Sequence, residues 1–286
     1  MARWAYVNGR YVPHDRAAVH VEDRGYQFAD GVYEVVTVLD GCFADMDGHL
    51  DRLGRSLDAL SIPWPVGRRV LERIVRELVR RNGMHNGSVY MQVSRGVAPR
   101  DFRFPSPRPS ALVITTRRVQ NWTQPGQLEN GVPVITIPDI RWGRRDIKTT
   151  GLLAQVLGKQ QAAEAGAYEA WMIDSDGSVT EGCSSNSWIV TAAGTLVTRE
   201  PSPKILNGVT RLTLLRLAGE IGLPVEERSF TVEEALAARE AFLSSAGTFA
   251  LPVTRIDGRA VGGGKPGPVT LDLRRAYIDD VLRRAA

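Results

Sequence analysis

The chain has 286 residues, of which 43% are hydrophobic and 24% are charged, and its formal net charge is +4 at pH 7. These are the values of an ordinary globular protein, so they exclude a disordered chain, a collagen and a coiled coil. A chain of this length can bury the core of one large or two ordinary domains without disulfides or structural metals.

The sequence shows no pattern of a membrane span, a signal peptide or a metal site. Its apolar runs are too short for a transmembrane helix, and Asn8-Gly9 interrupts the N-terminal segment before an apolar signal core could form. Cys42 and Cys183 have neither metal-ligand spacing nor a disulfide framework, and the four histidines are scattered. We therefore expect a cytoplasmic protein that binds no metal and no membrane.

The first part of the chain predicts an α+β domain over residues 1–119. Strands are indicated by short apolar runs beside Asn-Gly and Asp-Gly turns, and helices by apolar residues three and four positions apart. The expected elements are a hairpin over 5–12, a strand over 32–39, helices over 50–60 and 68–81, and strands over 88–95 and 111–119.

A polar segment with Pro and Gly, residues 120–131, predicts a connection to a second α+β domain over residues 132–286. The mixture of hairpins and helices there is too irregular for a TIM barrel or a doubly wound sheet. The expected elements are a strand over 132–138, hairpins over 170–180 and 187–197, and helices over 152–165, 210–221, 232–238 and 271–285.

Arginine is far more frequent than lysine, with 32 arginines and four lysines. A nucleic-acid-binding surface is one explanation of this excess. The helical segment 68–81 interleaves its arginines with Glu72 and Glu77, which favours an ordinary solvated surface. The shortage of lysine leaves only four candidates for any chemistry that requires one.

One of these lysines, Lys148, stands between a predicted strand and a predicted helix, after Arg141, Arg144 and Arg145. Neighbouring cations lower the pKa of a lysine and favour the neutral amine, which a Schiff-base lysine needs. The alternative from this segment alone is a solvated basic loop.

Two further segments have the composition of a cofactor site. In residues 179–186, Glu181 is followed by small and hydroxyl residues, and a buried carboxylate there could keep a pyridine nitrogen protonated. In residues 204–211, Gly208 precedes a predicted helix whose free N–H groups and dipole could bind a phosphate. Taken singly, the first segment could equally be an ordinary turn and the second a plain helix cap.

In this order the segments resemble the class IV aminotransferases, the fold-type IV enzymes that use pyridoxal 5'-phosphate (PLP). The resemblance extends from Tyr6 to about Arg259. The motifs that carry it are DRGYQFADGVYE at 23–34, HLDRL at 49–53, DIK at 146–148, TEG at 180–182 and LNGVTR at 206–211.

The resemblance implies a two-domain α+β homodimer and assigns the cofactor-binding residues. Lys148 is expected to form the Schiff base with PLP, and Glu181 to pair with the pyridinium nitrogen. The phosphate is expected to be held by Arg52 and by the N-terminal amides of Val209 and Thr210. Leu206 is expected to pack on the ring.

The segment SRGVAPR at 94–100 resembles the D-amino-acid aminotransferase branch of the family. This likeness implies that Arg100 binds the substrate carboxylate, for which a bidentate guanidinium is suited, and that Tyr33 and Arg141 line the substrate pocket. The branch typically has a His two residues after this Arg, where the present chain has Phe102. It also carries hydroxyl residues where this chain has Ala246-Gly247.

We therefore expect a transaminase that moves the amino group of D-amino acids, such as D-alanine and D-glutamate, to 2-keto acids. Within the same fold the alternatives are an (R)-amine or branched-chain L-amino-acid transaminase and, less favoured, a PLP lyase. Outside the enzymes the alternative is an arginine-rich nucleic-acid-binding protein, which leaves Lys148 and Glu181 unexplained; we expect no nucleic-acid partner.

Overall fold

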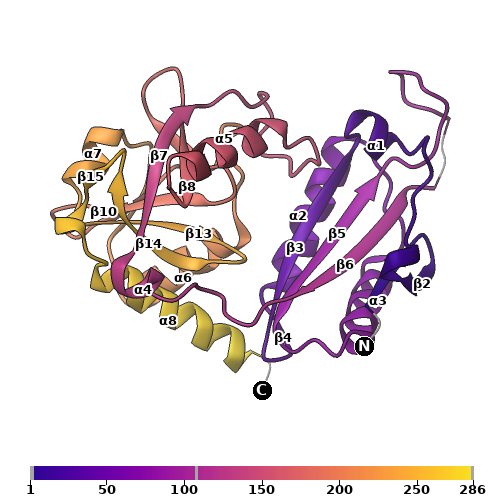
Figure 1. Ribbon diagram of the computed structural model, residues 1–286, viewed down its shortest axis with the longest axis horizontal. Helices are drawn as coiled ribbons and strands as arrows, with labels where there is room; N and C mark the ends of the chain where they lie inside the picture. The colour runs from indigo at the N-terminus through magenta and orange to yellow at the C-terminus, as the bar shows by residue number, and fades with distance from the viewer. Residues whose placement is uncertain (1–2, 107–108, 285–286) are drawn as a thin grey trace. The chain divides into compact units, whose positions relative to one another are not determined.

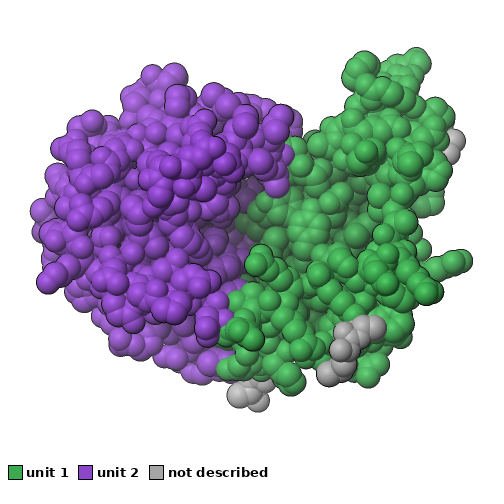
Figure 2. Space-filling view, in the orientation of Figure 1, with its two compact units in different colours: residues 1–120, 147–151, 285 green, residues 121–146, 152–284, 286 purple. Residues whose placement is uncertain are grey.

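The computed structural model describes residues 3–106 and 109–284, and the chain forms two compact units. The first unit contains the chain up to residue 120 together with residues 147–151, and the second contains residues 121–146 and 152–284 (Figure 2). The sequence alone places residues 147–151 with the second half of the chain, so their membership of the first unit is a feature that only the tertiary structure shows.

The first unit is built on a six-stranded antiparallel sheet with the strand order β2-β1-β6-β5-β3-β4 (Figure 1). Its strands are β1 (Trp4–Val7), β2 (Arg10–Pro13), β3 (Gly31–Leu39), β4 (Cys42–Phe43), β5 (Gly87–Ser94) and β6 (Ala111–Arg118). Its helical segments are η1 (His14–Arg16), α1 (Arg24–Phe28), α2 (Met46–Ala59) and α3 (Arg68–Arg81).

The apolar spacing of α2 and α3 explains why both helices pack on this sheet. Leu50, Leu53 and Leu57 follow one another at intervals of three and four residues on α2, and all three are fully buried. On α3, Leu71 and Val75 are buried in the same core. The expected helix over 68–81 is confirmed, while α2 begins four residues before its first leucine, at Met46, which is buried in the same core.

The segment 147–151 joins the first unit by pairing with the start of β3. The N–H of Tyr33 donates to the carbonyl of Lys148 at 3.0 Å, and the N–H of Thr150 donates to the carbonyl of Gly31 at 3.0 Å. Ile147 is buried in the core of this unit. These bonds fix the backbone of Lys148 beside Tyr33.

The second unit is built on a mixed sheet of nine strands. Eight of them follow the order β12-β11-β10-β13-β14-β7-β8-β9, and the ninth, β15, pairs with β14. The strands are β7 (Val132–Pro138), β8 (Glu169–Ile173), β9 (Val179–Gly182), β10 (Asn186–Val190), β11 (Leu196–Thr198), β12 (Val225–Glu227), β13 (Glu240–Ser245), β14 (Phe249–Ile256) and β15 (Arg259–Ala260). The helical segments are α4 (Gln127–Asn130), α5 (Leu153–Glu164), α6 (Val209–Glu220), α7 (Val232–Ala237), η2 (Gly262–Gly264) and α8 (Pro268–Arg283).

Helices α5, α6 and α8 pack against strands of this sheet. α5 lies against β7 and β8, whereas α6 and α8 pack on each other and on β13 and β14 (Figure 1). The sequence pattern indicated neither β13 nor β14, and β14 contains Pro252. A proline is rare inside a paired strand because it donates no ladder hydrogen bond, yet here it stands opposite Phe242 of β13.

The mixed helix and strand content confirms the expected α+β class. In the part of the chain that the structure describes, no helix combines the length and the apolar character required to cross a bilayer. The same residues contain no cluster of three or more His, Cys, Asp or Glu side chains that could hold a metal ion.

Candidate active site

Lys148 lies in the first unit with its ammonium group over an aromatic ring. Its Nζ is 4.2 Å from the ring centroid of Tyr33. The backbone N–H of Lys148 donates to Ser56 Oγ at 3.3 Å. The ring of Tyr33 in turn packs against that of Tyr90 with 5.5 Å between centroids. The structure thus brings together two of the expected site residues, Lys148 and Tyr33.

Two of the other three lysines, Lys159 and Lys204 but not Lys265, lie within ion-pair distance of carboxylates. Lys204 Nζ lies 2.7 Å from Asp174 Oδ2, and Lys159 Nζ lies 3.4 Å from Glu169 Oε1. Within the described residues Lys148 forms no such ion pair. An amine with no carboxylate partner is the one most readily available for covalent chemistry.

The arginines that precede Lys148 are each paired with a carboxylate of the second unit. Arg144 pairs with Asp146 at 2.9 Å, and Arg145 pairs with Asp139 at 3.2 Å. Arg141 pairs with Asp139 as well. Their positive charges are therefore compensated locally, which weakens the expectation that they act as free cations on the lysine.

Arg52 is held in the interior of the first unit by a carboxylate on the neighbouring strand. Its Nε and Nη2 donate to the two oxygens of Glu34 at 2.7 and 2.8 Å. Burial opposes ionisation of Glu34, but the charge and hydrogen bonds of Arg52 outweigh it and lower the pKa of Glu34 to about 2. Arg52 therefore has a fixed orientation before any ligand binds.

His49, one turn before Arg52 on α2, completes this cluster. Burial lowers the pKa of His49, so its ring is neutral. Its Nδ1 lies 2.7 Å from Glu34 Oε2, and because an ionised carboxylate only accepts hydrogen bonds, Nδ1 must donate. Glu34 and His49 stand within the motifs of the sequence, but no role was assigned to them there.

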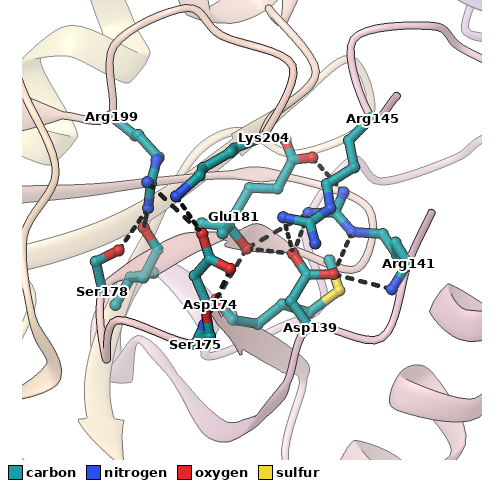
Figure 3. A network of polar contacts seen from close by, with 12 residues as sticks. Asp139, Arg141, Arg145, Asp174, Ser175, Ser178, Glu181, Arg199 and Lys204 are labelled. Atoms are coloured by element: carbon teal, nitrogen blue, oxygen red, sulfur yellow. Dashed lines mark hydrogen bonds and ion pairs between the residues drawn. The ribbon is translucent and has the colours of Figure 1, made fainter. Parts of the chain in front are cut away.

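Glu181 is a buried carboxylate of β9 that three donors fix in place, one of which, Arg141, is seen beside it in Figure 3. Its Oε1 accepts from the N–H of Leu206 at 3.0 Å and from Arg141, and its Oε2 accepts from Asn186 Nδ2 at 3.0 Å. Burial raises the pKa of Glu181, and the charge of Arg141 opposes that rise. A carboxylate has about four acceptor positions, so this group retains room for one further donor.

Arg141 belongs to the same network and is oriented by Asp139 (Figure 3). Its Nε and Nη2 donate to Asp139 at 3.0 and 2.7 Å, while Nη1 contacts Glu181. Asp139 also accepts from Thr180 Oγ1 at 2.7 Å. The structure therefore places Arg141 beside the carboxylate that is expected to face the cofactor nitrogen.

The segment that leads into α6 is tied to Glu181 through Asn186. Asn186 Nδ2 donates to the carbonyl of Leu206 at 2.9 Å as well as to Glu181. Gly208 precedes the helix, and a Cβ at that position would clash with Asn186 Oδ1. Asn186 has no role in the sequence analysis; its position five residues after Glu181 is the only signal that could have found it.

The first turn of α6 has the unsatisfied donors that a phosphate needs. Leu212 donates the first helical bond, to the carbonyl of Gly208, so the N–H groups of Val209 and Thr210 precede the ladder. Thr210 Oγ1 is buried and has no hydrogen-bond partner among the described residues. An orphaned hydroxyl beside free N–H groups and a positive dipole end fits an anionic group.

Arg100 is exposed in the first unit and stacks on aromatic rings. Its guanidinium carbon lies 4.6 Å from the ring centroid of Phe28 and 5.9 Å from that of Phe102. Phe102, which is 83% exposed, thus provides a stacking surface where the related sequences are expected to have a donor. Arg103 pairs with Asp101 at 2.7 Å, so its charge is engaged locally.

Comparison with known proteins gives a consistent result over nearly the whole chain. The profile of the family "Amino-transferase class IV" matches residues 31–256. The chain is 40% identical to D-alanine aminotransferase of Bacillus licheniformis, over 98% of this chain and 97% of that one. It is 37% identical to D-alanine aminotransferase of Staphylococcus haemolyticus, over 98% and 99% of the two chains.

Among solved structures, the fold is similar to that of branched-chain amino acid aminotransferases. The enzyme of Thermoproteus uzoniensis with norvaline has a TM-score of 0.87 at 26% identity, covering 99% of this chain and 96% of that one. The PLP form of the Thermobaculum terrenum enzyme has a TM-score of 0.83 at 25% identity, covering 99% and 95%. The Escherichia coli enzyme has a TM-score of 0.91 at 24% identity, covering 98% and 94%, and shows likeness of fold alone.

Proposed function

The chain belongs to the class IV aminotransferases, and we propose that Lys148, Glu181 and the first turn of α6 are its principal cofactor-binding residues. The enzyme is a PLP-dependent aminotransferase of fold type IV that acts on D-amino acids, as expected from the sequence. Bound PLP supplies an electron sink that stabilises negative charge at the substrate Cα.

The observation that carries the assignment is the state of Glu181. A carboxylate that is buried, held by Asn186 and Leu206 and charge-paired with Arg141 is an acceptor of fixed position beside a positive charge. Its remaining acceptor capacity suits the N–H of a protonated pyridine ring. Glu181 thereby maintains the positive charge on which the electron-sink chemistry depends.

We propose that the phosphate is bound by the N–H groups of Val209 and Thr210 and by Arg52. The two N–H groups and the orphaned Thr210 hydroxyl support the first assignment. The preorganised guanidinium of Arg52 supports the other, since a fixed donor loses less entropy on binding an anion. Leu206 contacts the cofactor ring in this proposal.

Lys148 would hold the cofactor through its side-chain amine, and the same amine, when free, would take the proton from the substrate Cα. Tyr33, whose ring lies against the Lys148 ammonium, orients the lysine or the substrate carboxylate. Arg141 lines the pocket through its position beside Glu181.

For the substrate we propose D-alanine and D-glutamate, with Arg100 as the carboxylate-binding residue and 2-keto acids as amino acceptors. A second candidate is a branched-chain amino acid or an amine without a carboxylate. It is favoured by one observation, the replacement of a hydrogen-bond donor by the exposed ring of Phe102.

We further propose that the enzyme is a cytoplasmic homodimer. Large apolar side chains, including those of Tyr26, Phe102 and Phe104, are exposed in the first unit, as is common where a second subunit binds. Cys42 and Cys183 are free thiols, which is compatible with a reducing compartment.

A half-reaction screen tests the proposed substrate class. The PLP form is mixed separately with D-alanine, D-glutamate, L-leucine and an (R)-amine, and conversion to the pyridoxamine form is followed by absorbance. We expect the D-amino acids to convert the enzyme fastest, with Lys148→Ala as the control that gives no conversion. Conversion by L-leucine alone would replace the proposed substrate class by the branched-chain one and leave the cofactor assignment intact.

A further inference from the structure

The turn that joins β13 to β14 is bound by a buried arginine, Arg274, which has no acidic partner among the described residues. We propose that Arg274 of α8 is a positioning residue for the cofactor phosphate: it fixes this turn and supplies a buried positive charge that is compensated only when an anion binds. The inference rests on the proposed function, because it takes the turn and the start of α6 as neighbours of the phosphate.

Arg274 differs from every other buried arginine that the structure describes. Five of them lie within 4.0 Å of a carboxylate. These pairs are Arg24 with Asp30, Arg52 with Glu34, Arg95 with Asp30, Arg199 with Asp174 and Arg211 with Glu227. Arg274 donates instead to two backbone carbonyls, those of Thr248 at 2.5 Å and Ala250 at 3.0 Å.

The groups near Arg274 are aromatic rings, the phenol of Tyr168 and two backbone carbonyls, and within the described residues no carboxylate forms an ion pair with it. Its guanidinium carbon lies 5.1 Å from the ring centroid of Phe249. Burial lowers the pKa of Arg274 to about 10, which still leaves the group ionised at neutral pH. A buried cation with no counterion is costly in a protein interior, so an anion that binds nearby regains part of that cost.

The two carbonyls that bind Arg274 flank a residue in a strained conformation. Phe249 has a φ of 57°, in the left-handed region that non-glycine residues rarely adopt. Its ring also stacks on that of Tyr277, one turn further along α8, with 5.4 Å between centroids. α8 therefore determines the path of the chain where the turn ends.

The turn itself is closed by hydroxyl groups. Ser245 Oγ lies 2.8 Å from Thr248 Oγ1, and the N–H of Thr248 donates to Ser245 Oγ at 3.2 Å. Ala246 and Gly247, between them, stand where related sequences are expected to carry hydroxyls.

Strand pairing places this turn next to the proposed cofactor residues. Ser244, at the end of β13, is paired with Asn186 of β10, the residue that binds both Glu181 and the carbonyl of Leu206. α6 also packs against β13. A charge on Arg274 therefore acts within the same part of the second unit as the first turn of α6, through a medium of low dielectric constant.

The test compares ligands with and without a phosphate. We would measure the affinity of the apoenzyme for PLP and for pyridoxal in the parent, in Arg274→Met and in Arg274→Lys. Arg275→Met is the matched control, since Arg275 is the exposed neighbour on α8 and pairs with Asp272 at 3.3 Å. Inorganic phosphate, titrated as a competitor of PLP, reports on the anion site alone.

We expect Arg274→Met to weaken PLP binding by about tenfold or more and pyridoxal binding by less than about twofold, because only PLP carries the dianion. Arg274→Lys should keep the ratio of the two affinities close to that of the parent, and Arg275→Met should change neither. Equal losses for PLP and pyridoxal in Arg274→Met would overturn the proposal, since they would mean that Arg274 only supports the turn.

If Arg274→Met does not fold, the lysine variant decides the matter. It keeps the charge but has fewer donors for the two carbonyls, so a fall in its PLP-to-pyridoxal affinity ratio would also overturn the proposal. A parent enzyme that binds neither ligand would contradict the proposed function itself, which separates the two failures.

Discussion

The guanidinium of Arg141 contacts the carboxylate of Glu181, and each side chain is only 5% exposed. Asp139 holds the same guanidinium from its other edge, at 2.7 Å. Burial raises the pKa of Glu181, as does the nearby charge of Asp139, whereas the charge and hydrogen bond of Arg141 oppose that rise. The following predictions test this site and the groups around it.

Lys148 should carry the cofactor. Borohydride reduction of the PLP form followed by peptide mapping should place the pyridoxyl group on Lys148, because it is the amine that pairs with a tyrosine ring instead of a carboxylate. Lys148→Ala should lose sustained turnover yet still bind PLP through its phosphate. Lys265→Ala is the control and should behave like the parent; label on Lys159, Lys204 or Lys265 would contradict the assignment.

Glu181→Gln should slow removal of the Cα proton by roughly 100-fold, because a neutral amide no longer stabilises the charge on the ring nitrogen. Single-turnover kinetics with D-alanine measures this step. Circular dichroism should show an unchanged fold, since the amide oxygen of Gln can still accept from the N–H of Leu206 and Asn186 Nδ2 keeps its bond to the carbonyl of Leu206. A rate close to that of the parent would mean that another group faces the ring nitrogen.

Thr210→Val should weaken PLP binding by about tenfold, the effect of one hydrogen bond to a charged group. The free energy of unfolding of the apoenzyme should not fall, because the hydroxyl removed is buried and unpartnered. Thr213→Val, on the same helix, is the control for PLP affinity. An equal loss in both variants would indicate a general effect on α6.

Arg100→Ala should raise the KM for D-alanine and leave the rate with a carboxylate-free (R)-amine nearly unchanged. Phe102→His should lower the KM for D-alanine, by about 10- to 150-fold if the histidine restores a bond worth about 1.5–3 kcal/mol. Arg103→Ala is the control because Arg103 pairs with Asp101. Equal losses for amino acid and amine in Arg100→Ala would point to a structural role of Arg100.

The stability of the first unit should depend on pH through Glu34. The pKa of Glu34 is about 2 in the folded protein and near 4.5 when unfolded, so its contribution is present above pH 4.5 and is lost as the pH falls towards 2. That contribution is about 3 kcal/mol. Between pH 5 and 2, Glu34→Gln should lose less unfolding free energy than the parent.

Glu77→Gln is the control for this pH dependence. Arg80 and Arg81 lower the pKa of Glu77 to about 2 as well, but the pair is at the surface, where solvent screens the interaction. Its unfolding curve should follow that of the parent. If Glu34→Gln and Glu77→Gln give the same curve, the buried cluster with Arg52 does not control acid stability.

Local patterns determined much of the secondary structure. Apolar spacing gave the helix over 68–81, and the Asn8-Gly9 turn gave the hairpin of β1 and β2, because each depends on residues a few positions apart. Pro252 marks the limit of such patterns, since a strand that accepts a proline does so through the partners it meets in the sheet.

The motifs also determined which residue types belong to the cofactor site, Lys148 and Glu181 among them. They could not show how those residues are held. The pairing of Lys148 with Tyr33 and of Glu34 with Arg52 joins segments far apart in the chain, and the packing of two cores decides both. The tertiary structure likewise decided that Asp139 pairs with Arg141 and that two backbone carbonyls accept hydrogen bonds from Arg274. A buried charged group needs such partners, and only the folded chain determines which groups lie within reach of it.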